Sequence, residues 1–429
     1  MKIAVIGAGS SYTPEAIDGL LGEKGFEPLE IALYDLPEGQ ERAGIIRDLA
    51  RRMAQAREAK ARVEVSKTLE EALGGADFVI SQFRVGLMQA RIHDEKAPLS
   101  MGLLGQETTG AGGFFKAMRT IPAALALAHE MERLCPSAWL INFTNPSGIV
   151  TEAVRKHSRI PCVGLCNVPY NMRVDAARLL GVEPERVDCT MAGLNHLSFV
   201  TEIYLDGRPV LQSLIDQGRF EQQLVKNIPK VPGVKDLIAT LRMVPSPYLQ
   251  YFYFEEEMVR KAQKDVREGR GTRGEQILET QEALFQLYKN PELREKPKEL
   301  EARGGAYYST VATILMRALA GLEDTVMPVC YSNQGAIADL AWDAVVETNA
   351  VISANRVRPV AFGKLPESVG GLVAQVKAYE SLTVEAAVTG SRSKAVQALL
   401  NNPLVHGYEN AVRLVDELAG AFPEFVQLR

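Results

Sequence analysis

The chain has 429 residues, and 48 Lys and Arg against 53 Asp and Glu give it a net charge of −5. This length exceeds what one hydrophobic core usually serves, so two closely packed domains are expected. The acidic balance argues against a nucleic-acid or anionic-membrane partner, while a local basic pocket for a phosphate stays compatible with it. We find no apolar run of membrane-spanning length and no signal peptide, so we expect a cytoplasmic protein.

Short β-branched runs alternate with amphipathic helical stretches over the first 165 residues. Strands separated by helices such as Glu41–Arg57 indicate a parallel sheet with right-handed crossovers. We therefore predict an α/β fold whose residues 1–165 form a doubly wound Rossmann domain. The expected strands are Ile3–Ile6, Ile31–Tyr34, Val63–Val65, Phe78–Gln82, Trp139–Phe143 and Cys162–Leu165.

The pattern changes after about residue 190. Leu197–Leu205 alternates like a strand and meets Asp206-Gly207, a strong hairpin signal. Long helices are expected at Glu255–Glu268, Gly274–Tyr288 and Ala336–Ile352. These features predict that residues 166–429 form an α+β lobe with an antiparallel sheet and covering helices.

Residues 1–12 (MKIAVIGAGSSY) resemble the start of a dinucleotide-binding unit. A buried strand runs into Gly7 and Gly9, which allow a tight turn and a close approach of backbone to a pyrophosphate, and a helix opens near Pro14. Asp35 ends the second strand, where a carboxylate binds a ribose 2′-hydroxyl and repels a 2′-phosphate, which favours NAD over NADP. Its alternative role is that of a turn residue. The predicted cofactor contacts are Gly7, Gly9, Ser10, Ser11, Tyr12 (at the place of the third glycine), Asp35 and Asn145.

Four polar segments lie at expected strand ends or in adjoining loops, where open α/β sheets bind ligands: Gly105–Gly113, Asn142–Ser147, Gly164–Pro169 and Gly193–Ser198. Two of them contain Cys166 and His196. A thiolate and an imidazole could hold a metal whose other positions stay open to substrate. The alternative is a buried small side chain and a hydrogen-bonded core histidine.

Other candidate residues have structural alternatives as well. The aromatic run Pro247–Phe254 is typical of a packed core or subunit interface, but one of its tyrosines could act as a base if a nearby cation lowered its pKa. Arg91 and Arg273 could pair with an anionic substrate group or form solvated salt bridges. Glu107 lies in a glycine-rich polar loop that could approach a ligand.

Taken together, the segments IGAGSSYTPE, GQETTGAGGF, NFTNPSG, GLCNVP, GLNHLSF and PYLQYF resemble glycoside hydrolase family 4, the NAD- and metal-dependent glycosidases. They occur in this order between residues 6 and 252. This family is an exception to glycoside hydrolysis by two carboxylates. Asn167, directly after Cys166, makes the segment similar to that of the 6-phospho-β-glucosidases.

The resemblance implies that Cys166 and His196 bind a divalent metal, expected to be Mn²⁺, which also contacts sugar O2 and O3. NAD⁺ would oxidise the C3 hydroxyl, Tyr248 would remove the acidified C2 proton, and the leaving group would depart by elimination. Water would then add, and the bound NADH would reduce C3 again. The implied sugar contacts are Arg91, Glu107, Asn145, Asn167 (also given a catalytic role) and Arg273, with the two arginines able to meet a 6-phosphate.

The expected activity is therefore hydrolysis of 6-phospho-β-glucosides by a homodimer or homotetramer. Alternatives are a glycosidase of the same family acting on a uronide or an unphosphorylated hexoside, an NAD-dependent 2-hydroxy-acid dehydrogenase, and a non-catalytic NAD-sensing protein. A dehydrogenase would need a partner carboxylate for His196, which the sequence does not suggest, and would leave Cys166 without a role.

Overall fold

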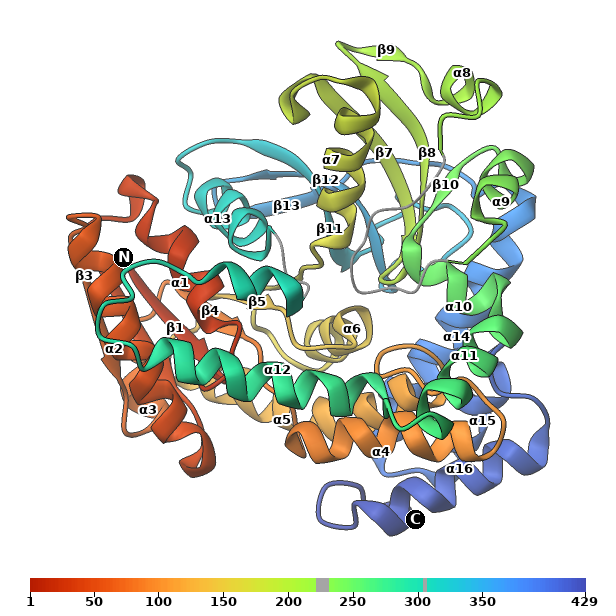
Figure 1. Ribbon diagram of the computed structural model, residues 1–429, viewed down its shortest axis with the longest axis horizontal. Helices are drawn as coiled ribbons and strands as arrows, with labels where there is room; N and C mark the ends of the chain where they lie inside the picture. Colours follow the sequence, from red (N-terminus) through yellow and green to blue (C-terminus); the bar gives the residue numbers. More distant parts are fainter. Residues whose placement is uncertain (221–230, 304–306) are drawn as a thin grey trace.

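The computed structural model describes residues 1–220, 231–303 and 307–429 (Figure 1). The strands are β1 (Lys2–Ile6), β2 (Leu29–Tyr34), β3 (Ala61–Val65), β4 (Phe78–Ser81), β5 (Trp139–Asn142), β6 (Cys162–Gly164), β7 (Val187–Leu194), β8 (Leu197–Leu205), β9 (Arg208–Pro209), β10 (Val244–Pro245), β11 (Thr325–Ser332), β12 (Val345–Ser353) and β13 (Arg356–Pro359). The helices are α1 (Thr13–Leu21), α2 (Gln40–Ala56), α3 (Leu69–Leu73), α4 (Leu87–Ser100), α5 (Gly110–Leu134), α6 (Ser147–His157), α7 (Val168–Leu180), α8 (Leu211–Asp216), α9 (Val234–Leu241), α10 (Gln250–Tyr253), α11 (Glu255–Arg267), α12 (Arg273–Tyr288), α13 (Tyr308–Leu319), α14 (Glu367–Thr389), α15 (Arg392–Asn401) and α16 (Tyr408–Ala421).

The main sheet has the order β13-β12-β11-β6-β5-β4-β1-β2-β3. Its part from β3 to β6 is parallel and follows the order 3-2-1-4-5-6 of a dinucleotide-binding Rossmann fold. The strand order reverses between β1 and β4, and such a switch point opens a crevice at the carboxyl ends of the strands. The predicted α/β class and doubly wound sheet are confirmed.

The sheet continues into strands from the C-terminal half of the chain. Strands β11, β12 and β13 join antiparallel to β6 and to one another, with Cys330 opposite Gly164. Strands from both sides of residue 165 therefore share one sheet, and the boundary between residues 165 and 166 stays a prediction. The helix expected at Ala336–Ile352 is wrong, because Val345–Ser353 is strand β12, hydrogen-bonded on both sides. Pairing with β11 and β13 outweighs the helical spacing of its apolar residues.

The second sheet is the antiparallel hairpin β7–β8, and both β10 and the short β9 pair with β8. The predicted strand at Leu197–Leu205 is confirmed, and both Asp206 and Gly207 have positive φ, as a two-residue hairpin turn requires. The lobe is α+β as predicted.

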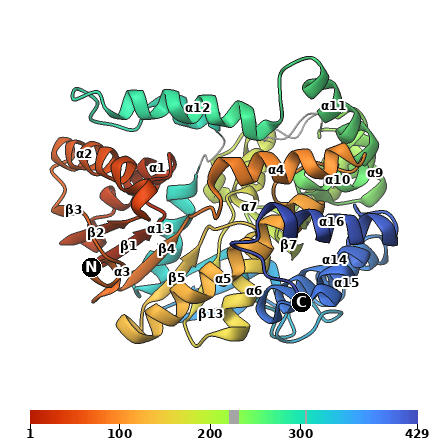
Figure 2. The same ribbon diagram turned by 90° about the horizontal axis from the view of Figure 1, so that it is seen from below.

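Helix α12 connects the two halves of the molecule, lying along α2 and α4 (Figure 2). At its C-terminal end the Tyr288 hydroxyl donates to the carbonyl of Ser11 at 2.8 Å. At its N-terminal end the amide of Gly274 donates to Glu95 of α4 at 2.7 Å. The helix is thereby held at both ends beside the carboxyl edge of the sheet. None of the described helices is long and apolar enough to cross a bilayer.

A buried carboxylate holds the C-terminal helices to the Rossmann half. Glu152 of α6 is fully buried and accepts hydrogen bonds from Lys377 and Ser381 of α14, each at 2.8 Å, and from the amide of Val345 at 3.0 Å. Burial alone would raise the pKa of Glu152, but Lys377 and Lys156 outweigh it and lower the pKa to about 2. The charged form is therefore the one that stabilises the fold.

We predict that Glu152→Gln lowers the free energy of unfolding at pH 7 by about 3 kcal/mol, because a pKa depressed by some two units corresponds to that much stabilisation. The contribution is present above the unfolded pKa of about 4.3 and disappears as the pH falls toward the folded pKa of about 2. The gap between wild type and variant in urea unfolding should therefore shrink at low pH. The exposed Glu130, changed to Gln, is the control and should stay within about 0.5 kcal/mol of wild type. A gap for Glu152→Gln that does not change with pH would contradict the assignment.

Candidate active site

A cavity of about 1500 Å³ extends from the carboxyl ends of β1 and β4 to the tip of the β7–β8 hairpin. It is larger than the pockets that usually take one small ligand. Of the predicted site residues, Ser11 is not part of its wall: this side chain is fully buried behind the turn. The others that line the cavity are Gly7, Gly9, Ser10, Tyr12, Asp35, Arg91, Glu107, Asn145, Cys166, Asn167, His196, Tyr248 and Arg273.

The turn after β1 is shaped for backbone to approach a ligand. Gly7 has a φ of +83°, and a Cβ there would lie 2.8 Å from the backbone of Phe83. A Cβ on Gly9 would lie 2.8 Å from the carbonyl of Gly39. Neither position therefore tolerates a side chain, and the turn leads into α1, whose first residues include Pro14.

Asp35 lies at the end of β2 on the wall of the cavity, and its carboxylate accepts the amide of Gly9 at 2.6 Å. Burial raises its pKa, and the hydrogen bond from Gly9 opposes this rise. Tyr12, at the place of the third glycine, caps α1 and stacks on Tyr308 of α13 at a ring distance of 5.8 Å. The aromatic pair thus occupies the space between α1 and α13.

Cys166 lies between β6 and α7, where the sheet edge meets the N-terminus of a helix. Its Sγ accepts the amide of Val168 at 3.5 Å and a side-chain hydrogen bond from Asn195. Burial, and next the charge of Glu347, raise the pKa of the thiol, while these two hydrogen bonds act in the opposite direction. The protein alone therefore keeps Cys166 as a thiol, but it presents donors suited to a thiolate.

His196 occupies the tip of the β7–β8 hairpin in a left-handed conformation with a φ of +64°. Such a φ is uncommon for a residue other than glycine and often marks a functional position. Burial, followed by the charge of Lys116, lowers the pKa of His196 to about 3. The imidazole is therefore neutral, which is the form that binds metals.

Tyr248 lies face to face with His196, with ring centroids 3.6 Å apart and planes 2° from parallel. It belongs to the short turn Pro247–Leu249 that follows β10. Burial and the neighbouring Cys166 raise its pKa well above the ordinary value for tyrosine. The rest of the aromatic run packs largely against core side chains, as its structural alternative predicted: Phe252 and Tyr253 pack on the C-terminal core.

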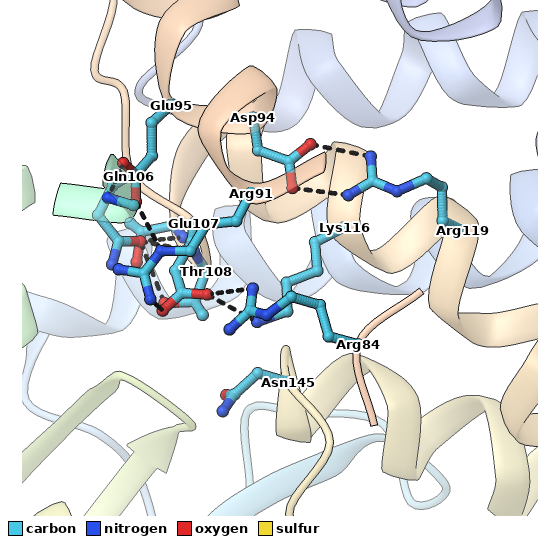
Figure 3. A network of polar contacts seen from close by, with 12 residues as sticks. Arg84, Arg91, Asp94, Glu95, Gln106, Glu107, Thr108, Lys116, Arg119 and Asn145 are labelled. Atoms are coloured by element: carbon cyan, nitrogen blue, oxygen red, sulfur yellow. Dashed lines mark hydrogen bonds and ion pairs between the residues drawn. The ribbon is translucent and has the colours of Figure 1, made fainter. Parts of the chain in front are cut away.

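Glu107 is surrounded by cationic side chains, as Figure 3 shows. Its carboxylate is 2.6 Å from Arg84, 3.0 Å from Arg91 and 2.9 Å from Lys116. Burial alone would raise the pKa of Glu107, but the three cations outweigh it and hold the pKa well below the ordinary value. Counting Glu95, which pairs with Arg91 at 2.9 Å, two carboxylates face three cations, so the cluster keeps an excess of positive charge on the cavity wall.

Arg91 and Arg273, predicted as a pair of anion contacts, lie at the same side of the cavity. Arg91 is buried and donates to Glu95 at 2.9 Å. Glu95 in turn accepts the amide of Gly274, the residue after Arg273 at the start of α12. Arg91 is thus a buried ion-pair partner rather than a solvated one, whereas Arg273 is exposed.

Sequence analysis missed several charged residues of this wall. Arg84, Glu95 and Lys116 all line the cavity. Arg91 and Glu95 are four residues apart on α4, a spacing that could have suggested their pairing. Lys116 stands alone in an apolar stretch of α5, where burial and the charge of Arg84 lower its pKa to about 8. A lysine between apolar residues could have suggested a buried charged group at this position.

The amides of the two predicted asparagines also reach the cavity. Asn145 follows β5 and forms a side-chain hydrogen bond with Tyr308, and Asn167 is the residue before α7. Both therefore face the space between the dinucleotide-type turn and Cys166.

The donor set near the hairpin tip fits a divalent metal with open positions. In the described ranges no group of three or more His, Cys, Asp or Glu side chains could hold a metal ion. Cys166 and His196 both lie on the cavity wall, and they would supply one sulfur and one neutral nitrogen of the kind that transition metals accept. The remaining positions would be filled by oxygens of a bound molecule, as in catalytic sites.

Most of the chain matches the models of one protein family. Residues 2–182 match the model for family 4 glycosyl hydrolases, and residues 191–405 match the model for the family 4 glycosyl hydrolase C-terminal domain. A probable 6-phospho-beta-glucosidase of Bacillus subtilis (strain 168) is 42% identical over 99% of this chain and 97% of its own length.

Two solved structures are similar to this chain over its whole length. The 6-phospho-beta glucosidase from Thermotoga maritima, solved with manganese, NAD+ and glucose-6-phosphate, is 34% identical over all of both chains with a TM-score of 0.91. A 6-phospho-alpha-glucosidase from gut microorganisms, in complex with NAD and glucose-6-phosphate, is 27% identical over all of both chains with a TM-score of 0.88. The predicted resemblance is confirmed over the whole length, and the chain belongs to glycosyl hydrolase family 4.

Proposed function

We propose that this protein hydrolyses 6-phospho-β-glucosides with NAD and a divalent metal, expected to be Mn²⁺, by oxidation, elimination, addition and reduction. The observation that carries the proposal is the convergence of Cys166, His196 and Tyr248 at one end of a cavity whose other end is the Gly7–Gly9 turn. A cofactor site and a candidate base thus face the same space.

The residues that would hold the dinucleotide are those of the turn and of β2. Gly7 and Gly9 leave room for backbone to meet a pyrophosphate, and the N-terminus of α1 would favour its charge. Asp35 would accept a ribose hydroxyl. The relative from Thermotoga maritima contains NAD+, which supports NAD as the cofactor here.

When bound, NAD would accept a hydride and return it, and the metal would stabilise negative charge developing on sugar oxygens. Cys166 and His196 would hold that metal, and Tyr248 would take the proton next to the oxidised carbon. Tyr248 can act as a base only when its pKa is lowered, because its surroundings raise the pKa well above the ordinary value for tyrosine. A cation held by Cys166 and His196 would lower the pKa of Tyr248 again, because His196 stacks on this tyrosine.

The cationic wall supports a phosphorylated substrate. Arg84, Arg91 and Lys116 carry more positive charge than Glu107 and Glu95 together neutralise. Arg273 is the first residue of helix α12 beside them. Such a wall suits an anionic group, with Arg91 and Arg273 as the proposed phosphate contacts and Glu107, Asn145 and Asn167 as sugar contacts. Asn167 directly after Cys166 supports the β-anomer, as does the higher identity to the β-glucosidases than to the α-glucosidase. A homodimer or homotetramer stays a prediction.

We predict that Cys166→Ser lowers the turnover of p-nitrophenyl β-glucoside 6-phosphate at least about 100-fold, because a hydroxyl replaces the thiolate ligand. Reactions would contain Mn²⁺, NAD and a reductant. Cys189→Ser, which changes a buried cysteine of β7 outside the cavity wall, is the matched control and should stay close to wild type. Preference for the unphosphorylated glucoside or the α-anomer would contradict the substrate, and full activity of Cys166→Ser would contradict the metal site.

We predict that deuterium from the solvent enters C2 of the sugar during turnover and that Tyr248→Phe abolishes this exchange, lowering kcat about 100-fold or more, as for loss of a general base. Mass spectrometry of the released sugar measures the label. Tyr253→Phe, from the same aromatic run but outside the cavity wall, should retain exchange. Net accumulation of NADH without sugar release would instead indicate a dehydrogenase.

We predict that Asp35→Asn lowers the preference for NAD over NADP about tenfold or more, because the variant loses the charge that repels a 2′-phosphate. Asn can still accept the amide of Gly9 through its oxygen, so the turn should persist. Titration of both dinucleotides by intrinsic fluorescence measures the ratio, with Glu41→Gln on the exposed first turn of α2 as control. An unchanged ratio would show that Asp35 does not meet the ribose.

A further inference from the structure

Asn195, which precedes His196 at the hairpin tip, has contacts that the proposed reaction does not use. Its Nδ2 donates to Oε1 of Glu347 at 3.0 Å, and its side chain also hydrogen-bonds Cys166. A carboxamide nitrogen carries two hydrogens, so it can serve the carboxylate and the sulfur at once. Asn195 therefore connects Cys166 to a strand of the main sheet.

Glu347, the partner of Asn195, is itself held in one orientation. It lies on β12, is 2% exposed and accepts the Ser198 hydroxyl at 2.8 Å through its second oxygen. The Cys330 thiol adds a longer contact of 3.6 Å to the first oxygen. With both oxygens occupied, the carboxylate has little freedom to turn, and the amide of Asn195 is fixed in the same way.

The sulfur of Cys166 consequently receives donors from two rigid elements. One is the amide of Val168 at the start of α7, 3.5 Å away, and the other is Asn195 on the hairpin. Cys166 also lies on the wall of the cavity. Such outer contacts orient a metal ligand and typically change metal affinity by 10- to 100-fold.

We infer that Asn195, held by Glu347, is a positioning residue that orients the Cys166 sulfur and adjoining His196 backbone for binding a divalent metal. The inference rests on the proposed metal site. Neither residue would contact the metal. Asn195 acts through Cys166 and through the adjoining backbone of His196, and Glu347 acts through Asn195. Loss of the amide should leave the sulfur held by the Val168 amide alone. This should weaken metal binding without affecting the dinucleotide end of the cavity.

The test is titration of the full-length variants with Mn²⁺ and Co²⁺ in the presence of NAD. Asn195→Ala and Glu347→Ala should each weaken Mn²⁺ binding about tenfold or more and reduce the thiolate-to-cobalt charge-transfer absorption. Glu347→Gln keeps an acceptor for Asn195 and should stay within about threefold of wild type. NAD affinity should be unchanged in all three variants.

Asn349→Ala is the matched control. Asn349, also on β12, binds the backbone of β7 through Met191 and Cys189 but has no hydrogen bond to Asn195 or Cys166 among the described contacts. If Asn349→Ala weakens Mn²⁺ binding as much as Asn195→Ala does, the docking of the β7–β8 hairpin alone explains the effect, and the inference is overturned.

Two further outcomes separate the inference from the function on which it rests. Wild-type affinity and an unchanged cobalt spectrum for Asn195→Ala, with binding that still requires Cys166, would overturn the inference alone. A wild-type titration that Cys166→Ser leaves unaltered would overturn the proposed metal site and the inference together.

Discussion

The parallel strands β1, β4, β5 and β6 end at one edge of the main sheet, and the cavity is built on that edge. Their register places the turn after β1 beside the segment that follows β4, and the loop after β5 beside Cys166 after β6. Because parallel strands need crossover helices, each of these loops leads to or from a helix that covers the sheet. Segments separated by more than a hundred residues thus contribute to a single wall.

The other half of the site depends on how the β7–β8 hairpin docks. Side chains of β12 bond the backbone of β7: Thr348 to the carbonyl of Met191 at 2.9 Å and Asn349 to its amide at 2.8 Å. This contact holds the tip with His196 against the sheet edge. The C-terminal strands therefore position His196, which belongs to the other sheet. Strand β12 thus affects the site although none of its residues lies on the cavity wall.

Burial sets the chemical state of the key groups and makes several depend on a ligand. The protein alone keeps Cys166 and Tyr248 protonated and His196 neutral. A cation bound between sulfur and imidazole would favour the ionised forms of the thiol and the phenol. Also on the cavity wall, Glu107 is paired with three cations, and this pairing offsets the cost of burying its charge.

Part of the structure of this protein could be predicted from local sequence patterns alone. The strands of the Rossmann half, the glycine turn and Asp35 could be predicted because each depends on neighbours in sequence. The signals are short β-branched runs that are buried on both faces, a positive φ at Gly7 and the end of a strand. Cys166, His196 and Tyr248 could be named from motifs, but their convergence could not, since it requires the hairpin to dock on β12. For the same reason β12 was mistaken for a helix, because its apolar spacing suits either structure until β11 and β13 pair with it. Arg84, Lys116, Asn195 and Glu347 meet their partners only through contacts between distant segments, so the tertiary structure alone decided the charged wall and the contacts around Cys166. The sequence by itself determined the dinucleotide-type fold and named Cys166 and His196 as candidate metal ligands, because both depend on local motifs.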